Sequence, residues 1–554
     1  MKITAHLTLS LASLFTAAAI AAPAAIYVDP VNGKDTNSGT AADQAFATIE
    51  KSRDTIRAQK LPATTVNLRG GRYELKSTLL LDDRDSGTTY RAYKNEKPVI
   101  SGGRRVTGWK QVPGKPYWEA SVPVSAGFTD WFWQLYVNGV RAERARSNTT
   151  LKIAEFNKEG FTVQPDRLRA YTNVEDIRCL WVHVFKAGDI PVAGISSNSF
   201  KMQQPAWEIW NGWKDGATKT REFFVVNAFE ELDEPGEWYL NRQTRALYYY
   251  PFKRDDMTTA EVYAPVVEGL VKVTGAHDLR IEGLTFEHGQ WLDPQRKLLG
   301  RSQAEIYMGD TKTYSSELPG QIILDRVTNM VMNGCTVRHM GSCGVQVYEG
   351  CHRVTIEGNT CYDTTAAGIT VGKFWMAQDQ CPADTVSTDI LVANNIVRDV
   401  GRDYPQGTGI NIFAAQRCHV YHNDVSDTSY TGIHARIGDT GKVNPAIGQI
   451  EYKYNKVSHG FQDHKWGIDD GGHLYMHGRY PGSVVAENYS LHASRFINNE
   501  YYSDNWSHTV LWSKNISRYS KATRPYDAWH PGNVSVVFDG NYSDRPSPNT
   551  RNSK

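Results

Sequence analysis

The sequence predicts an all-β fold, a right-handed parallel β-helix, into which an antiparallel β-sandwich is inserted. From about residue 265 onward, short strands recur with a period of about two dozen residues, which is typical of solenoids. An asparagine stands near the start of each repeat. Between about residues 106 and 260 the repeat is absent and hairpin-like segments replace it. Coils of this kind bury a shared core that no single coil can bury alone.

The recurring asparagine indicates an internal ladder. It stands at Asn359, Asn395, Asn423, Asn455 and Asn488, in "GNTCYD", "NNIVRD", "HNDVSD", "YNKVSH" and "ENYS". Cys335 takes the same place one repeat earlier. Because stacked amides can satisfy one another in a tight turn, we expect a structural role for this column.

A second column follows four residues after each of these positions. Its role is open between a structural ladder, which we favour, and the edge of a groove. Its members are His339, Asp363, Asp399, Asp427, His459 and His492.

The chain divides into five predicted segments. Residues 1–24 resemble a cleavable signal peptide, with Lys2, an apolar stretch too short for a membrane anchor, and small residues before "IYVDP". A cap and the first coils follow at 25–105, the inserted sandwich at 106–260, the main β-helix at 261–545 and a disordered tail at 546–554. The protein is therefore expected to be secreted or periplasmic, without a membrane anchor.

The amino-acid composition makes some classes of binding partner more suitable than others. The 61 Lys and Arg residues nearly balance the 60 Asp and Glu residues, and basic runs are absent from the sequence, which argues against nucleic acid. The 15 Trp and 29 Tyr residues suit a carbohydrate surface as well as a core. Trp207, Trp210 and Trp213 in the insert could form a sugar platform, although a place in the core is the more common role. We expect a monomer.

The cysteine pattern predicts neither a metal site nor a cofactor. Seven cysteines are present, and their spacing differs from that of zinc ligands. An odd number leaves at least one thiol unpaired within the chain. Structural thiols, or one or two disulfides, are both compatible with this pattern. The seven are Cys179, Cys335, Cys343, Cys351, Cys361, Cys381 and Cys418.

Alternation along the strands predicts which side chains face outward. In "GIHARIG" the apolar residues should point inward, so His434 and Arg436 point outward. Applying the same rule to neighbouring coils gives a polar patch of consecutive rungs. These rungs are Asn411, then His434 and Arg436, then Tyr475 and His477, then Tyr502 and Asp504.

Two aspartates at the edge of this patch are candidates for acid and base catalysis. Hydrolysis of a glycosidic bond needs two carboxyl groups that flank the bond. Asp470 enters the Tyr475 strand and Asp504 ends the Tyr502 strand, so they belong to neighbouring coils. Asp469 or Asp463 could replace Asp470. Aspartates also form turns in solenoids, so spacing alone leaves both roles open.

Several motifs resemble glycoside hydrolase family 141, a family of secreted β-helix enzymes that includes α-L-fucosidases and a xylanase. These motifs are "LYVNGVRAERAR" (135–146), "FEELDEPGEWYLNRQTRALYYYP" (229–251), "IEGLTFEHGQW" (281–291), "DGGHLY" (470–475) and "YYSDNWS" (501–507). The architecture is also similar to that of family 120 β-xylosidases. The resemblance implies a glycoside hydrolase that acts on a plant or algal saccharide. It places the carboxylate pair on Asp470 and Asp504. We expect substrate contacts from the outward rungs and from Trp506, that is, from Asn411, His434, Arg436, Tyr475, His477, Tyr502 and Trp506.

Two other functions remain possible at this point. A polysaccharide lyase on the same scaffold would use His477 or His434 as base and Arg436 opposite a uronate, often with calcium. A non-catalytic carbohydrate-binding protein would need only the aromatic residues.

This sequence departs from the family pattern at His473, which occupies a place that usually holds a small residue.

Overall fold

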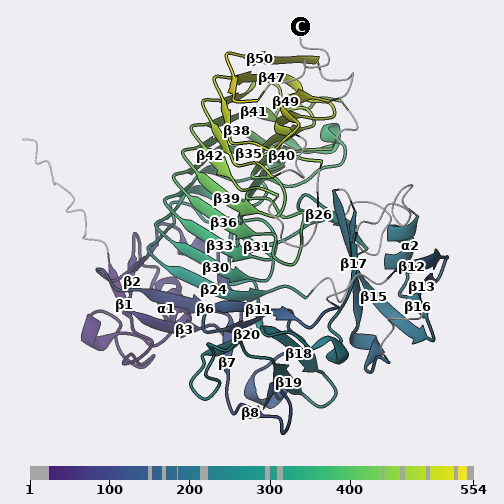
Figure 1. The fold of residues 1–554 in the computed structure, drawn as a ribbon. Helices are drawn as coiled ribbons and strands as arrows, with labels where there is room; N and C mark the ends of the chain where they lie inside the picture. The colour runs from purple at the N-terminus through teal and green to yellow at the C-terminus, as the bar shows by residue number, and fades with distance from the viewer. Residues whose placement is uncertain are drawn as a thin grey trace, which may run out of the picture.

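The computed structural model describes residues 24–147, 152–164, 170–183, 185–212, 222–292, 300–308, 316–438, 442–461, 468, 470–494, 499–529 and 534–545. Most of the predicted signal peptide and the predicted tail lie outside these ranges. Three long parallel sheets wind around one axis (Figure 1). The predicted right-handed parallel β-helix is therefore confirmed. The described residues contain no helix with the length and apolar character needed to cross a membrane.

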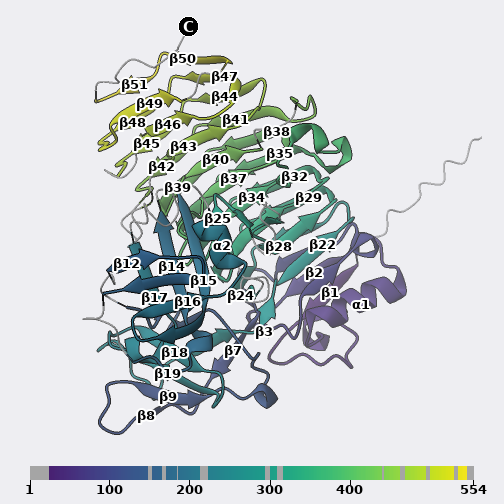
Figure 2. The same ribbon diagram turned by 90° about the vertical axis from the view of Figure 1, so that its right-hand side faces the viewer.

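Each coil contributes one strand to each of the three sheets. Sheet A runs from β1 (Ala25–Val28) to β50 (Val534–Asp539), and sheet B from β3 (Gly71–Glu74) to β51 (Tyr542–Ser543). Sheet C runs from β4 (Leu79–Leu81) to β49 (Arg524–Ala528), and its strands follow one another up the molecule in Figure 2. All pairings within these three sheets are parallel, so residues at equal positions form columns along the axis.

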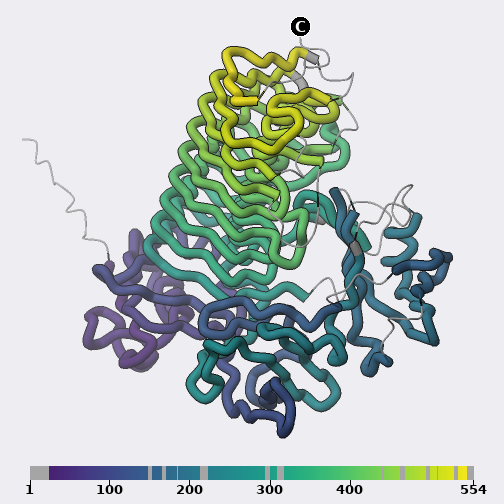
Figure 3. The backbone as a smooth tube through the Cα atoms, in the orientation of Figure 1, coloured from purple at the N-terminus to yellow at the C-terminus, as the bar shows by residue number. Residues whose placement is uncertain are grey.

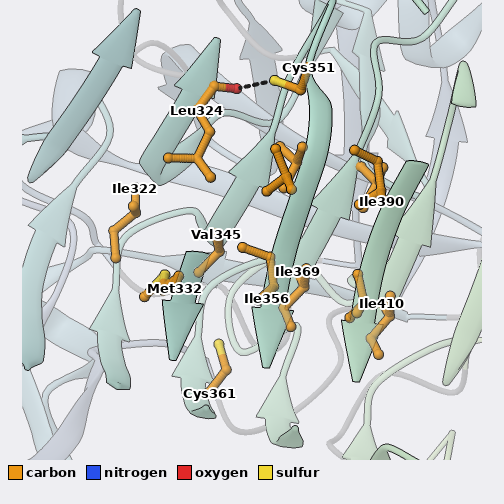
Figure 4. Packing of buried hydrophobic residues seen from close by; sticks show 14 of the residues in the cluster. Ile322, Leu324, Met332, Val345, Cys351, Ile356, Cys361, Ile369, Ile390 and Ile410 are labelled. Carbon is orange, nitrogen blue, oxygen red and sulfur yellow. Dashed lines mark hydrogen bonds between the residues drawn. The ribbon is translucent and has the colours of Figure 1, made fainter. Parts of the chain in front are cut away.

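Apolar columns fill the inside of the helix. On sheet C, Ile322, Val345, Ile369 and Ile410 are partners in successive strand pairs and point into the core (Figure 4). At the N-terminal end, α1 (Ile49–Gln59) packs Ile49 and Ile56 against the same core. The helix thus covers apolar surface that the first coil would otherwise expose.

The asparagine column forms the predicted ladder. The side-chain Oδ1 of each asparagine accepts a hydrogen bond from the backbone N–H of its counterpart one coil earlier, at 2.9–3.1 Å. Each side-chain N–H₂ also donates to a backbone carbonyl of the preceding coil. The ladder starts at Cys335, as expected, and extends beyond Asn488 to Asn515 and Asn541.

The His/Asp column has a conformational role. All six members adopt positive φ angles between 52° and 57°. Asn, Asp and His tolerate this left-handed region better than most residues. The strand register skips this position, as between Arg338–Tyr362 and Met340–Thr364. The column therefore marks a repeated bend in sheet B.

The chain leaves the β-helix partway through its second coil and returns much later. β6 (Pro98–Ser101) is the sheet B strand of that coil, and β22 (Val271–Thr274), after the insertion, is its sheet C strand. On return, β22, β23 (Arg280–Glu282) and β24 (Thr285–Gln290) pair with β4, β5 (Thr89–Ala92) and β6, respectively. The insertion consequently projects from the lower coils (Figure 3).

The insertion forms two mainly antiparallel sheets with separate hydrophobic clusters. One sheet has the order β7-β20-β10-β11-β18-β19-β9-β8. Its strands are β7 (Gly103–Val106), β8 (Lys110–Gln111), β9 (Trp118–Ser121), β10 (Leu135–Val137), β11 (Val140–Arg144), β18 (Glu237–Asn241), β19 (Ala246–Tyr249) and β20 (Val262–Pro265). The other surrounds β15 (Lys186–Ser196) and continues into β25 (Arg301–Gln303), β26 (Ile306–Met308) and β27 (Ser316–Glu317). The sequence predicts that this segment belongs to the β-helix, but β25, β26 and β27 extend the inserted sheet, where Ser302 pairs with Ala187.

The tryptophans of the insert are core residues. Trp207 and Trp210, on α2 (Ala206–Asn211), are fully buried in the cluster that also contains Trp181. They therefore offer no sugar platform. Trp213 lies outside the described residues.

Ion pairs fix the insertion on sheet B. Arg141 of β11 (Val140–Arg144) donates to Asp363 at 2.6 Å and to Asp403 at 3.2 Å. Asp363 also contacts the Nδ1 of His339 at 2.6 Å. These groups are largely buried, so loss of either partner would leave an uncompensated charge.

All seven cysteines are free and buried, so the disulfide alternative was wrong and the structural-thiol alternative is correct. Five of them lie in the core of the β-helix, among them Cys361 and Cys418. Burial raises the thiol pKa of both to about 12. These thiols stay protonated and act as small apolar side chains.

A chain of polar groups enters the core near the C-terminal end. The Gly460 N–H donates to His473 Nε2 at 3.1 Å, and His473 Nδ1 lies 2.7 Å from Ser490 Oγ. Ser490 donates in turn to Glu500, which also accepts from Ser517 at 3.0 Å. Burial lowers the pKa of His473 to about 3 and raises that of Glu500 to about 7.

Replacing Asn423 in the middle of the ladder by alanine should lower the free energy of unfolding by about 2–4 kcal/mol, because buried backbone groups on both sides lose their partners. Asn541→Ala is the matched control. It ends the ladder and is half-exposed, so water can replace its bonds. Urea unfolding measures both variants. Equal losses would contradict the ladder's contribution.

Glu500→Gln should change the pH dependence of stability. Because the folded-state pKa of Glu500 is raised to about 7 from its usual 4.5, its contribution is complete below pH 4.5 and is lost as the pH rises through 7. The wild type should therefore lose about 3 kcal/mol relative to Glu500→Gln across this interval. Thermal unfolding of both proteins from pH 4 to 8 tests this, and parallel curves would disprove it.

Candidate functional site

The outward rungs of sheet C have the predicted order. Asn411 of β37 (Ile410–Ile412) pairs with His434 of β40 (Ile433–Arg436), and His434 pairs with Tyr475 of β43 (Leu474–His477). Tyr475 pairs with Tyr502 of β46 (Asn499–Ser503). One rung further, Tyr502 pairs with Asp527 of β49. The alternation rule thus locates these side chains on one face of three or more successive coils.

Asp504 lies at the end of its strand beneath two phenols. Its backbone N–H donates to the Met476 carbonyl at 2.9 Å, which continues the strand pairing by one residue. Tyr475 donates to Oδ2 at 2.5 Å and Tyr502 to Oδ1 at 3.1 Å. An ionised carboxylate has only acceptors, so two aligned O–H donors match that form.

Asp470 lies at the opposite end of the neighbouring strand. It has a φ of 60°, and its carbonyl accepts from the Tyr430 hydroxyl at 2.7 Å. The next two residues are glycines in tight surroundings: a Cβ on Gly471 would meet Phe461 at 2.6 Å, and one on Gly472 would meet the Glu500 carbonyl at 3.1 Å. This close turn brings the half-buried Asp470 into the lining of the same cavity as Tyr502.

The two aspartates share one cavity of about 370 Å³. Tyr502 also lines it, so three of the predicted site residues meet there. The charges of Asp504 and Asp470 contribute, after burial, to raising the pKa of Tyr475 and Tyr502 well above the usual value. Both phenols therefore remain hydrogen-bond donors at neutral pH.

Six further residues line this cavity that the sequence reasoning missed. Asp527 adds a third carboxylate and pairs with Arg524 at 2.9 Å, while Trp529 is 46% exposed. The same alternation rule, applied one coil further to "RPYDAW", would have located Asp527. The six are Asn499, Asn505, Thr523, Arg524, Asp527 and Trp529.

The other predicted contacts lie beside the cavity and do not line it. His434 stacks on Tyr475 with ring centroids 4.5 Å apart, and half-buried His477 meets Tyr475 edge-on at 6.4 Å. Arg436 donates to the Gln303 carbonyl at 3.3 Å. These side chains extend the patch toward the N-terminal coils.

The remaining predicted substrate contacts, Asn411 and Trp506, differ from each other in solvent exposure. Asn411 is fully buried. Trp506, which is half-buried, has the Arg479 guanidinium over its ring at 5.0 Å. The reserve candidates Asp469 and Asp463 lie outside the described residues.

The insertion forms a wall next to the carboxylates. Leu180 and Val182 of β14 (Arg178–His183) and Phe224 of β17 (Glu222–Val226) belong to the same hydrophobic cluster as Tyr475 and Tyr502. Apolar packing on this side keeps water away from the phenols and strengthens their bonds to Asp504.

A group of possible metal ligands lies away from this cavity. Among the described residues, Glu287, His288 and His339 have ligand atoms within 4.8 Å of one another. Arg72 and Arg338 both pair with Glu287, and Asp363 binds His339. Two guanidinium groups already neutralise the carboxylate, so these residues fit the ion-pair network that holds the insertion. The absence of a metal and of a cofactor stays an expectation.

Comparison with known proteins supports the β-helix and the insertion. Residues 268–445 match the family described as the right handed beta helix region, and residues 114–252 match the GH141 insertion domain. A solved structure described as a glycoside hydrolase is 21% identical, with a TM-score of 0.78, and the match covers 93% of this chain and 96% of that chain.

A second solved structure, described as the complex structure of XylC with xylose, is 14% identical with a TM-score of 0.51. That match covers 89% of this chain and 70% of that chain. The search of curated proteins found no match. Both solved structures share the fold of this chain. The chain is thus a right-handed parallel β-helix protein, and the segment inserted between its early and late coils matches the GH141 insertion domain.

Proposed function

We propose that the chain is a glycoside hydrolase whose carboxylate pair is Asp504 and Asp470. One observation carries the proposal: the two aspartates stand at opposite ends of neighbouring strands and line one cavity together with Tyr502. This arrangement suits a sugar bound over the tyrosines, with one carboxyl group on each side of the bond. The GH141 insertion domain supports the same reaction class.

The hydrogen bonds distinguish the roles of the two carboxyl groups. Asp504 receives an O–H donor at each oxygen, so we assign it as the ionised group that attacks the anomeric carbon or activates water. Asp470 is then the acid that gives its proton to the leaving oxygen. The glycosidic C–O bond breaks as the leaving oxygen takes the proton of Asp470, and water supplies the hydroxyl of the new reducing end. The second proton of that water goes to Asp470 if Asp504 attacked the anomeric carbon, and to Asp504 if Asp504 activated the water.

The proposal also covers the substrate and the location of the protein. The resemblance to family 141 favours an α-L-fucoside or a xylan, and the fold shared with XylC is compatible with a xylose-containing substrate. The leader sequence supports export from the cytoplasm. A screen of aryl fucosides, aryl xylosides and plant or algal polysaccharides tests the substrate class. Hydrolysis yields a saturated reducing end, lysis yields a product that absorbs in the ultraviolet, and binding alone yields neither.

Asp504→Asn and Asp470→Asn should each lower kcat/KM on the natural linkage by about 10³-fold, since each removes a group that acts in the transition state. A substrate with a good leaving group distinguishes the acid role of Asp470 from the nucleophile or base role of Asp504. A dinitrophenyl glycoside needs no protonation, so Asp470→Asn should recover much of its rate on it, whereas Asp504→Asn should stay inactive.

Asp424→Asn is the matched control, because this aspartate pairs with Lys456 on the outer face of sheet B. It should keep wild-type turnover. Near-wild-type activity of Asp504→Asn would show that the pair is wrongly assigned. Recovery of Asp504→Asn instead of Asp470→Asn would reverse the two roles.

A further inference from the structure

The C-terminal side of the carboxylate cavity is formed by a coil whose side chains take no part in the proposed proton transfers. Arg524 begins β49, and Trp529 follows the last residue of that strand. Both line the cavity of about 370 Å³, together with Asp527. Asp527 is the partner of Tyr502 in the strand register. We call Arg524, Asp527 and Trp529 the C-terminal wall.

Trp529 stands next to Asp504 along the helix axis. The Trp529 N–H donates to the Ser503 carbonyl at 2.9 Å, just as the Asp504 N–H donates to the Met476 carbonyl one coil earlier. The two residues therefore occupy the same position in successive coils, whose backbones are separated by about 4.8 Å. A sugar ring bound at Asp504 lies within reach of the indole.

Trp529 also offers an aromatic surface that a ligand can cover. It is 46% exposed, whereas Tyr502 is 3% exposed because it stacks on Tyr475 and donates to Asp504. An indole combines a large apolar face with one N–H donor, so it suits a ligand that has both apolar and polar surfaces. The C–H face of a sugar ring, bordered by hydroxyl groups, is a ligand of this kind.

Arg524 supplies hydrogen-bond donors at the other end of the wall. Its Nη1 donates to Asp527 at 2.9 Å, and its side chain is 39% exposed. A guanidinium has five N–H donors in a fixed plane, and this bond engages one of them. Asp527 is buried, so it holds the guanidinium in one orientation while other donors face a ligand.

The charges around the cavity favour an uncharged sugar. The lining residues that the structure describes include three carboxyl groups, those of Asp470, Asp504 and Asp527, and one guanidinium, that of Arg524. Because Asp527 already compensates Arg524, an anionic ligand would meet carboxylate charge. A uronate or a sulfated sugar is therefore disfavoured, whereas sugar hydroxyls can accept from the guanidinium and donate to the carboxylates.

We propose that the C-terminal wall binds the sugar ring whose anomeric carbon faces Asp504. Trp529 packs against the C–H face of this ring, and Arg524, which Asp527 positions, donates to one of its hydroxyl groups. This inference rests on the proposed function and adds a substrate class to it: a glycoside whose sugar at the cleaved bond is uncharged. The wall selects the sugar, while Asp470 and Asp504 cleave the bond.

Removal of the indole gives the first test. On the 4-nitrophenyl glycoside that the wild type cleaves, Trp529→Ala should raise KM about tenfold, because the sugar loses a contact that it makes before and during the reaction. Trp529→Phe should restore most of the affinity, since a phenyl ring keeps an apolar face. Tyr519→Ala is the matched control and should keep the wild-type KM, because Tyr519 is 58% exposed but does not line the cavity.

Two results of this test would overturn the role of the indole. One is an unchanged KM for Trp529→Ala. The other is a Trp529→Phe variant that binds as weakly as Trp529→Ala.

Substrates that lack one hydroxyl group test Arg524. The wild type should cleave one monodeoxy analogue of the same glycoside with about tenfold lower kcat/KM, because the guanidinium has lost its acceptor. Arg524→Gln should lose about tenfold on the parent glycoside and nothing further on that analogue, since the same bond is already missing. Asp527→Asn, which weakens the hold on Arg524, should show a smaller loss with the same pattern. Losses that multiply on every analogue would show that Arg524 binds no sugar hydroxyl.

A charged analogue tests the substrate class. The uronide that carries a carboxylate on C5 of the same sugar should be cleaved at least about tenfold more slowly than the neutral glycoside at low salt. The difference should shrink as salt screens the carboxylates. Equal rates for the two glycosides at low salt would contradict the uncharged substrate.

Asp504→Asn separates this inference from the proposed function. If that variant cleaves the 4-nitrophenyl glycoside normally, the carboxylate assignment fails, while a raised KM in Trp529→Ala would still support the wall. If Asp504→Asn is inactive and the variants of Trp529 and Arg524 keep wild-type kinetics on every probe, only the C-terminal wall is refuted.

Discussion

The asparagine ladder is the interaction on which the rest of the structure depends. Each rung joins two coils through a side-chain oxygen and a backbone N–H at a nearly constant distance, so every coil restarts at the same place. With the restart fixed, period-two alternation assigns each following side chain to the core or to the outer face. A slip of one residue would exchange the two faces of sheet C, and Tyr475 and Tyr502 would no longer reach Asp504.

The candidate site therefore uses residues at the ends of strands as well as residues on the outer face of sheet C. Asp504 follows the last residue of β46, while Asp470 precedes β43 across two glycines. Both carboxyl groups nevertheless line one cavity together with Tyr502. The insertion adds apolar packing on one side, from Leu180 and Phe224. A rigid coil stack thus sets the positions of the polar groups, and a separate domain limits the access of water to them.

Sequence periodicity was sufficient for the fold class, the ladder and the order of the outward rungs, because these follow from local rules repeated in every coil. It did not reveal Asp527 and Arg524, since the alternation was not extended past the Asp504 strand. It also could not show that β25 joins the inserted sheet, because Ser302 pairs with Ala187 more than a hundred residues away. Whether the cysteines form disulfides likewise depends on the tertiary structure. Cys361 and Cys418 lie inside the coils, where no second thiol meets them.

The interruption of the first coils affects the order in which the protein can fold during synthesis. Strands β4, β5 and β6 are complete at Ser101, yet their partners begin only at Val271. A ribosome that releases the N-terminal cap therefore leaves three strand edges open until the whole insertion has emerged. Open edges invite pairing with other chains, and closure over such a long segment is slow. Rapid folding of the insertion on its own would bring its two ends together and shorten the time needed for this closure. The inserted domain therefore also affects how long the nascent chain is exposed to aggregation.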